Sequence, residues 1–192
     1  STLQTGSGSN AGSITGSVAN SGLVVFTRND SLTYGCVISG SGAVSPAGGS
    51  TRARSNANTY PAQTTIGSGS TLQINNGGSL TSNVTDNGLF VYNRTDASTY
   101  AGQITGTGGL TVNSGTFVLT GANSYSGATS IALGSTLQIG NGGTSGSITS
   151  NVTNSGLLAF SRTDTLTYGG VISGAGAVSV NNGMTLVLTG AN

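Results

Sequence analysis

The chain has 192 residues, of which 34 are glycine and only 5% are charged, and its formal net charge is +1. It contains no Lys, Glu or His, and its few Arg and Asp residues form no run of like charge. This composition excludes a basic surface for nucleic acid or anionic lipid, so we expect no nucleic-acid partner. The longest apolar runs, such as Leu23–Phe26, are far shorter than the roughly 20 residues that span a bilayer, which excludes a transmembrane helix.

From its beginning the sequence is repetitive. Ser-Thr-Leu-Gln occurs at Ser1, Ser70 and Ser135, which divides the chain into repeats 1–69, 70–134 and a truncated 135–192. Equivalent positions are Leu3/Leu72/Leu137, Val18/Val84/Val152, Gly22/Gly88/Gly156, Phe26/Tyr92/Phe160, Arg28/Arg94/Arg162, Asp30/Asp96/Asp164 and Tyr34/Tyr100/Tyr168. Repeats built from strand-like pieces predict a single elongated array in which each unit buries its apolar face against the next.

In chain order, each copy alternates short segments rich in Val, Ile, Leu, Thr and Tyr with clusters of Gly, Asn and Ser. The segments are typical of strands and the clusters of turns, and glycine interrupts every stretch that is long enough for a helix. Short strands with glycine-rich turns are compatible with a sandwich, a closed barrel or a solenoid.

The spacing of apolar residues favours the solenoid. Two tracks in the C-terminal part of the chain advance by about 20 residues at each step, the length of one solenoid turn: Ile131, Val152 and Ile172, and Leu137, Leu158 and Val178. The middle copy has two similar tracks, each followed by a longer step into the last copy: Ile66, Val84 and Ile104, and Leu72, Phe90 and Leu110. We therefore predict an all-β parallel β-solenoid with about three coils in each repeat of about 65–69 residues.

One segment of the first copy departs from this pattern. Where the other copies have an apolar strand, the residues from Pro46 to Ser55 include Arg52 and Arg54. Two interpretations stay open: a functional loop that exposes two arginines, or a degenerate coil.

Residues that could perform catalysis are scarce. The carboxylates are Asp30, Asp86, Asp96 and Asp164, and the three that recur in each copy are expected to lie three coils apart, about 14 Å, too far for a catalytic pair. A chain without His and with one Cys has no zinc constellation. We therefore predict no catalytic, cofactor-binding or metal-binding residues, and no cofactor.

Two further features have a functional and a plain interpretation. Arg-x-Asp, at Arg28, Arg94 and Arg162, is either a row that contacts glycans or a repeated local ion pair with its head groups in water. Cys36 stands where the other copies have Gly102 and Gly170, and is either a reactive thiol or a chance replacement beside a turn.

Two stretches carry a family resemblance. The sequence from Gly115 to Ile131, continued from Gly134 to Gly143, resembles the passenger-associated transport repeat of bacterial autotransporters, also called the autotransporter-associated β-strand repeat. The sequence from Leu166 to Val178 is similar to segments that accompany this repeat. The resemblance implies a right-handed parallel β-helix in a passenger domain. It also implies export through the protein's own C-terminal outer-membrane barrel, and display on a Gram-negative cell or release from it.

Three classes of function follow from these observations. The first is a non-enzymatic stalk of a surface passenger, part of an adhesin, biofilm factor or virulence protein, with a host surface, a glycan or a neighbouring cell's passenger as partner. The second is a carbohydrate- or surface-binding face of exposed Thr, Asn and Tyr, and the third is a glycan-degrading β-helix enzyme. The chain starts and stops within the repeat, so we expect a piece of a longer protein whose open ends associate end to end.

Overall fold

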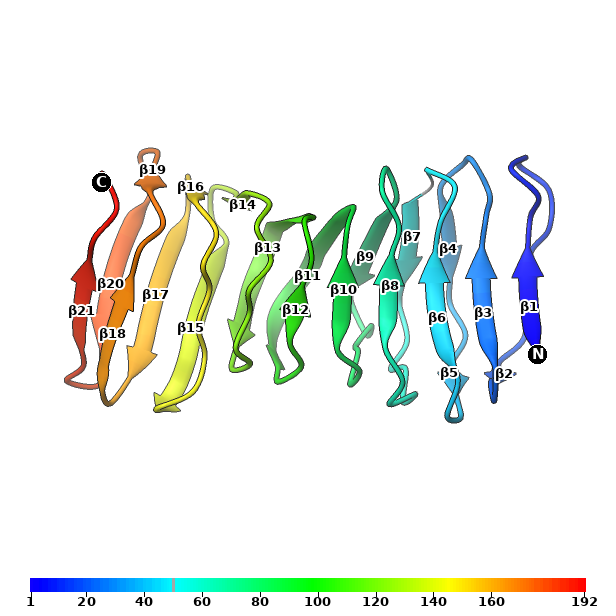
Figure 1. Cartoon of the computed structure of the whole chain (residues 1–192), viewed down its shortest axis with the longest axis horizontal. Helices are drawn as coiled ribbons and strands as arrows, with labels where there is room; N and C mark the ends of the chain where they lie inside the picture. The colour runs from blue at the N-terminus through cyan, green and yellow to red at the C-terminus, as the bar shows by residue number, and fades with distance from the viewer. Residues whose placement is uncertain (50) are drawn as a thin grey trace.

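The computed structural model describes residues 1–49 and 51–192 as an elongated stack of short strands, with the two termini at opposite ends (Figure 1). These residues contain no helix, and hence no helical segment with the length and hydropathy to cross a membrane. The 21 strands pair only in parallel. Glycine-rich turns and β-branched segments produce this pattern, because both disfavour helices and favour short strands.

The strands are grouped in sheets that run along the stack. The first sheet contains β1 (Thr2–Thr5), β3 (Leu23–Phe26), β6 (Ala43–Pro46), β8 (Thr64–Ile66), β10 (Val84–Asp86) and β12 (Ile104–Thr105). The second contains β4 (Leu32–Tyr34), β7 (Thr51–Arg54), β9 (Thr71–Asn75), β11 (Leu89–Tyr100), β13 (Gly109–Leu119), β14 (Thr129–Ile131), β16 (Val152–Asn154) and β19 (Ile172–Ser173), with β15 (Thr136–Gly143), β17 (Leu157–Arg162) and β20 (Ala177–Asn181) branching from β13. Two short pairs complete the list: β2 (Val18–Ala19) with β5 (Ile38–Ser39), and β18 (Thr165–Tyr168) with β21 (Thr185–Leu188).

A single coil shows why the stack is a solenoid. The chain leaves β8, forms β9, passes the bridge between Ser79 and Ala57, and returns as β10 directly beside β8. Val84 thereby pairs with Thr64 of the preceding coil and with Ile104 of the following coil. The predicted all-β parallel solenoid is confirmed.

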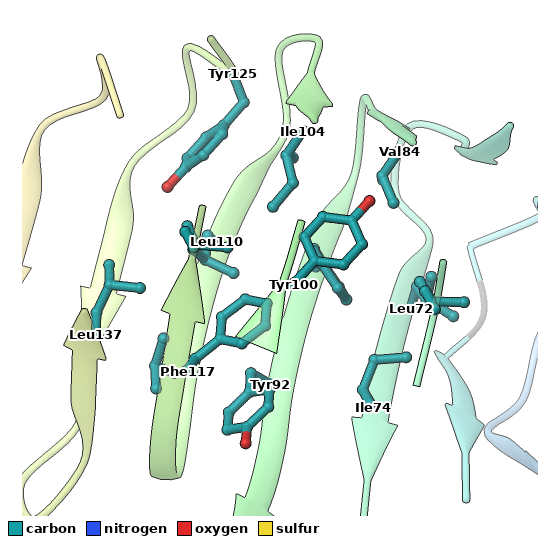
Figure 2. Packing of buried hydrophobic residues seen from close by; sticks show 14 of the residues in the cluster. Leu72, Ile74, Val84, Tyr92, Tyr100, Ile104, Leu110, Phe117, Tyr125 and Leu137 are labelled. Atoms are coloured by element: carbon teal, nitrogen blue, oxygen red, sulfur yellow. The ribbon is translucent and has the colours of Figure 1, made fainter. Parts of the chain in front are cut away.

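Every coil contributes apolar side chains to one continuous core. Leu72, Phe90 and Leu110 lie above one another in successive coils and are 0–1% exposed. In the middle of the stack the rings of Tyr92 and Phe117 are parallel, 4.4 Å apart at 14° (Figure 2). Since one cluster of buried apolar side chains runs through the stack, burial of this core is the main stabilising contribution.

The predicted tracks are partly right. Leu137, Leu158 and Val178 pair in successive coils, and so do Leu72, Phe90 and Leu110. The track through Ile131 is wrong in its first step, because Ile131 pairs with Asn154, and right in its second, because Val152 pairs with Ile172. The track through Ile66 behaves in the same way: Ile66 pairs with Asp86, and Val84 pairs with Ile104 as predicted. The longer step from Leu110 into the last copy is also wrong: Leu137 stacks on Phe117.

The error in the step from Leu110 has a physical cause, which is that the copies do not stack directly upon one another. Leu3, Val44 and Thr64 lie in one column of paired residues that runs from coil to coil. The residue equivalent to Leu3 in the next copy, Leu72, is not in this column but eight residues after Thr64, further round the same coil. Leu72 connects in the same way to Thr129, and Leu137 lies eight residues beyond that. Since a coil has about 20 residues, each copy covers about three and a third coils and begins on the next side of the solenoid.

The structure rules out one of the two interpretations of the segment from Pro46 to Ser55; its Ser50 lies outside the described residues. The strand is retained as β7, and Arg52 and Arg54 are each 1% exposed, so the interpretation as a loop with exposed arginines is wrong. Arg52 pairs with Leu72 and Arg54 with Ile74, so both occupy inward positions of the coil. Strand alternation fixes which positions face inward, whatever residue occupies them.

The two buried arginines are satisfied to different degrees. The Nη1 atom of Arg52 donates to the Asp30 carbonyl at 3.0 Å. The guanidinium of Arg54 lies 5.2 Å from the ring centre of Phe26 and 5.7 Å from that of Tyr34, and none of its three nitrogens has a hydrogen-bond partner. Burial therefore lowers the pKa of Arg54. Burying the Arg54 guanidinium without hydrogen-bond partners lowers the stability of the coil that contains β7.

Candidate functional site

The Arg-x-Asp motif forms the most regular polar arrangement in the chain. In the last copy Arg162 donates from Nε and Nη2 to the two carboxylate oxygens of Asp164, at 2.8 and 2.6 Å. Its Nη1 atom donates to the carbonyl of Gly146, in the turn that closes the preceding coil. That turn needs glycine: Gly140 and Gly146 have φ of +82° and +96°, and a Cβ on Gly140 would lie 2.7 Å from Cγ of Arg162.

The same arrangement occurs in the other two copies. Arg28 binds Asp30 and donates to the Gly12 carbonyl at 2.6 Å, and Arg94 binds Asp96 and donates to the Gly78 carbonyl. The hydrogen bonds from the arginines lower the pKa of the three aspartates. We call each set of one arginine, its aspartate and the glycine carbonyl a staple, because the set joins one coil to the turn of the coil before it.

The location of the staples corrects one interpretation and bears on another. The arginine side chains are only 10–13% exposed, so the prediction of head groups in water is wrong for the arginines, and it holds better for the aspartates, which are 31–56% exposed. The first staple follows β3, the second lies within β11 and the third begins at the last residue of β17, and these three places belong to different sides of the solenoid. They therefore do not form the single row that a glycan-contacting surface would need.

The fourth carboxylate, Asp86, is isolated from the staples. It is 0% exposed, and its Oδ1 atom accepts a hydrogen bond from the Gly88 amide at 2.9 Å. Each of the other aspartates is paired with its own arginine. Within residues 1–49 and 51–192, no three His, Cys, Asp or Glu side chains lie close enough together to hold a metal ion.

Buried hydroxyl groups form two equivalent chains inside the solenoid. Tyr125 contacts Thr129 at 2.7 Å, and Thr129 contacts Ser150 at 2.7 Å. Tyr60, Thr64 and Ser82 repeat this arrangement at 2.8 and 3.0 Å. These hydroxyls are enclosed by the core, where their hydrogen bonds contribute to stability and not to contact with a substrate.

A cavity of about 20 Å³ between Tyr92, Tyr100 and Phe117 has room for roughly one water molecule.

The exposed surface is rich in hydroxyls and poor in rings. All ten aromatic side chains are buried, with exposures of 0–4%, so the predicted binding face cannot include tyrosine. Hydroxyl residues do line up in register on the outside: Thr65, Thr85 and Thr105 on the first sheet, and Thr111, Ser130, Thr153 and Ser173 on the second.

Cys36 is partly exposed and its Sγ atom donates to the carbonyl of Thr15 at 3.1 Å. Its side chain also packs against the core, beside the turn where the prediction placed it. Both contacts fit a partly buried cysteine that acts as a small hydrophobe with a weak S–H donor.

Comparison with known proteins gives one match that bears on function. Over 89 residues, 43% of this chain, the sequence is 54% identical to the adhesin BmaC autotransporter of Brucella suis biovar 1 (strain 1330). The chain is similar to part of an autotransporter adhesin. The match covers only 2% of the length of that adhesin.

The other two comparisons found nothing: no family model matches this chain, and no solved structure does. The adhesin match supports the autotransporter side of the resemblance. Assignment to the passenger-associated transport repeat in particular, and the division into repeats 1–69, 70–134 and 135–192, stay predictions.

Proposed function

We propose that this chain is a non-enzymatic stalk segment in the passenger of an autotransporter adhesin, displayed on a Gram-negative cell surface or released from it. The observation that carries this proposal is the 54% identity to BmaC over a region folded as a uniform solenoid. In the longer protein, its partners would be its own outer-membrane barrel during export and a host surface, a glycan or a neighbouring cell's passenger afterwards.

The arrangement of polar groups supports a structural role. The staples, and several of the asparagine side chains and buried hydroxyls, bond to residues about one coil away, such as Arg162 to Gly146, Asn123 to Ile104 and Ser150 to Thr129. Interactions of this kind hold neighbouring coils together, as expected in a repeat array whose stability depends on nearest-neighbour contacts. A glycan-degrading enzyme would need several convergent charged side chains on one outer face, and the staples point instead to three different sides.

A deletion in the full-length protein tests the proposal. Removing residues 70–134 joins Gly69 to Ser135, so that one Ser-Thr-Leu-Gln segment replaces its equivalent, and about three and a third coils are lost. We expect surface display to be nearly unchanged, as measured by protease accessibility on intact cells. The control, removal of residues 70–102, cuts within the coil pattern and should reduce display strongly. Equal loss of display from both deletions would contradict a modular stalk.

The hydroxyl rows favour a second candidate, a surface-binding face. Ser130, Thr153 and Ser173 are exposed and occupy the same outward position of consecutive coils. Incubating the chain with a panel of glycans separates the candidates. Turnover would support an enzyme, and binding that is lost in Thr153→Val would support the face. Neither effect is expected of a stalk.

A further inference from the structure

An asparagine with a fixed structural role occurs in two copies, and an aspartate replaces it in the third. Asn20 and Asn154 are 6% and 1% exposed, and each accepts a hydrogen bond at Oδ1 from the amide two residues later, at 3.0 and 3.1 Å. The Nδ2 atom of each donates to a carbonyl in the following coil, that of Ala43 or Ala177, at 2.8 Å. The side-chain amide thereby connects the end of a strand to the start of a strand in the next coil.

Asp86 occupies the same position in the middle copy. Its Oδ1 atom accepts from Gly88, and its main-chain carbonyl accepts from Gly108 at 2.7 Å, as the Asn154 carbonyl does from Gly176 at 2.8 Å. The carboxyl group lies directly against Gly108, where a Cβ would be 2.3 Å from Cγ of Asp86. Backbone and side chain therefore have the geometry of the asparagine copies.

One hydrogen bond is missing from this equivalence. The counterpart of Ala43 and Ala177 in the middle copy is Gly109, which lies as far beyond Asp86 in the sequence as those alanines lie beyond their asparagines. The Oδ2 atom of Asp86 is buried and has no hydrogen-bond partner. An ionised carboxylate only accepts hydrogen bonds, so it has nothing to donate to a carbonyl, whereas a protonated carboxyl has one O–H donor.

We propose that Asp86 is a pH-sensitive latch between two coils: when protonated it donates to the Gly109 carbonyl as Asn20 and Asn154 donate to theirs, and when ionised it weakens that junction. The protonated and ionised states of Asp86 differ only in this one hydrogen bond, because the main-chain contacts around the side chain are the same in all three copies.

The electrostatic surroundings of Asp86 agree with this geometry. Burial raises the pKa of Asp86 to about 6, and the amides of Gly88 and Phe90 oppose that rise. The ionisable group that Asp86 influences is the buried phenol of Tyr125, two coils further along the stack, whose own pKa is raised mainly by burial. The arginine closest in sequence, Arg94, is bound to Asp96.

The direction of the pH effect follows from proton linkage. The folded chain holds the proton of Asp86 more tightly than the unfolded chain does, so the stabilisation is complete below about pH 4 and is lost as the pH rises through about 6. The staple aspartates have lowered pKa values and stay ionised above pH 5, so they add no pH dependence in this window. We expect the folding equilibrium constant to fall roughly tenfold between pH 5 and pH 7.5.

Urea unfolding at pH 5 and pH 7.5 tests the latch in matched variants. The unchanged chain should have the higher midpoint at pH 5. Asp86→Asn should remove the difference and match or exceed the unchanged chain at pH 7.5, and Asn154→Asp should introduce a second pH-dependent junction. Asp96→Asn, which changes an exposed carboxylate, should leave the difference as it is.

A measurement on the unchanged chain guards against variants that fail to fold. The chain has four Asp and no Glu, so a carbon-detected NMR titration resolves each carboxyl group. A midpoint for Asp86 between 5 and 7 supports the latch. A midpoint below 4.5, or a pH dependence of stability that persists in Asp86→Asn, would overturn it.

Discussion

The staple of the last copy makes a quantitative prediction about Arg162→Ala. The substitution removes a charge-assisted hydrogen bond to the Gly146 carbonyl, for which mutational data give about 1.5–3 kcal/mol. It also removes the side-chain stem that packs on Gly140, and a buried CH₂ contributes about 0.8 kcal/mol. Water replaces part of the lost hydrogen bonding, since the turn is near the surface. We expect the free energy of unfolding to fall by about 2–3 kcal/mol, well above the 0.2–1 kcal/mol typical of an exposed ion pair.

Urea unfolding at pH 7, followed by the circular dichroism of the strands, measures this loss. Asp164→Asn is the control, because it removes the partner charge while Arg162 still reaches the Gly146 carbonyl. Its midpoint should shift less than that of Arg162→Ala. If Arg162→Ala lost under about 0.5 kcal/mol, or no more than the control, the motif would be an ordinary surface ion pair and the staple would be wrong.

Three other predictions test the core, the strained coil and the ends. Leu158→Asp places a charge between Leu137 and Val178 and should destabilise by roughly 4 kcal/mol or more, while the same change at Leu133, which is 86% exposed, should alter the urea midpoint little. Arg54→Leu introduces the residue of the equivalent Leu119 and should raise the free energy of unfolding by about 1–4 kcal/mol; a lower value would show that its ring contacts outweigh the cost of burial. The apolar residues Leu3, Val178, Val180 and Leu188 are 43–48% exposed at the two ends, so light scattering should show association at rising concentration, and a strict monomer at millimolar concentration would contradict this.

The sequence was sufficient to predict the fold class because glycine content, strand-forming segments and apolar spacing all agree. It was insufficient for the packing of one copy on the next. Equivalent residues such as Leu72 and Leu137 suggest direct stacking, yet they lie on different sides of the solenoid, and only the strand register reveals the shift of eight residues. The first half of the long strand β13 pairs with β14 and its second half with β15. The spacing of apolar residues does not reveal that one strand takes part in two sides of the solenoid.

The polar residues show a second limit. An exposed loop stayed open as one interpretation of Arg52 and Arg54 because arginine is usually exposed, but the alternation of β7 places both inside. The role of Asp86 was missed because it was compared with the other carboxylates and not with Asn20 and Asn154, its equivalents in the repeat. Comparing repeat copies position by position would have shown a titratable residue in a structural asparagine position.

Deleting one coil tests the stacked-coil account most directly. Removing the segment from Val84 to Gln103 takes out one whole coil and joins Asn83 to Ile104, which occupies the same side as Val84. We expect a folded chain with parallel-strand circular dichroism, shorter by about one strand spacing, ~4.8 Å, in small-angle X-ray scattering. Removing only the first half of that coil, from Val84 to Asn93, breaks the register and should give a chain that is largely unfolded beyond the cut. If the half-coil deletion folded as well as the whole-coil deletion, coils stacked in register would not be what holds this molecule together.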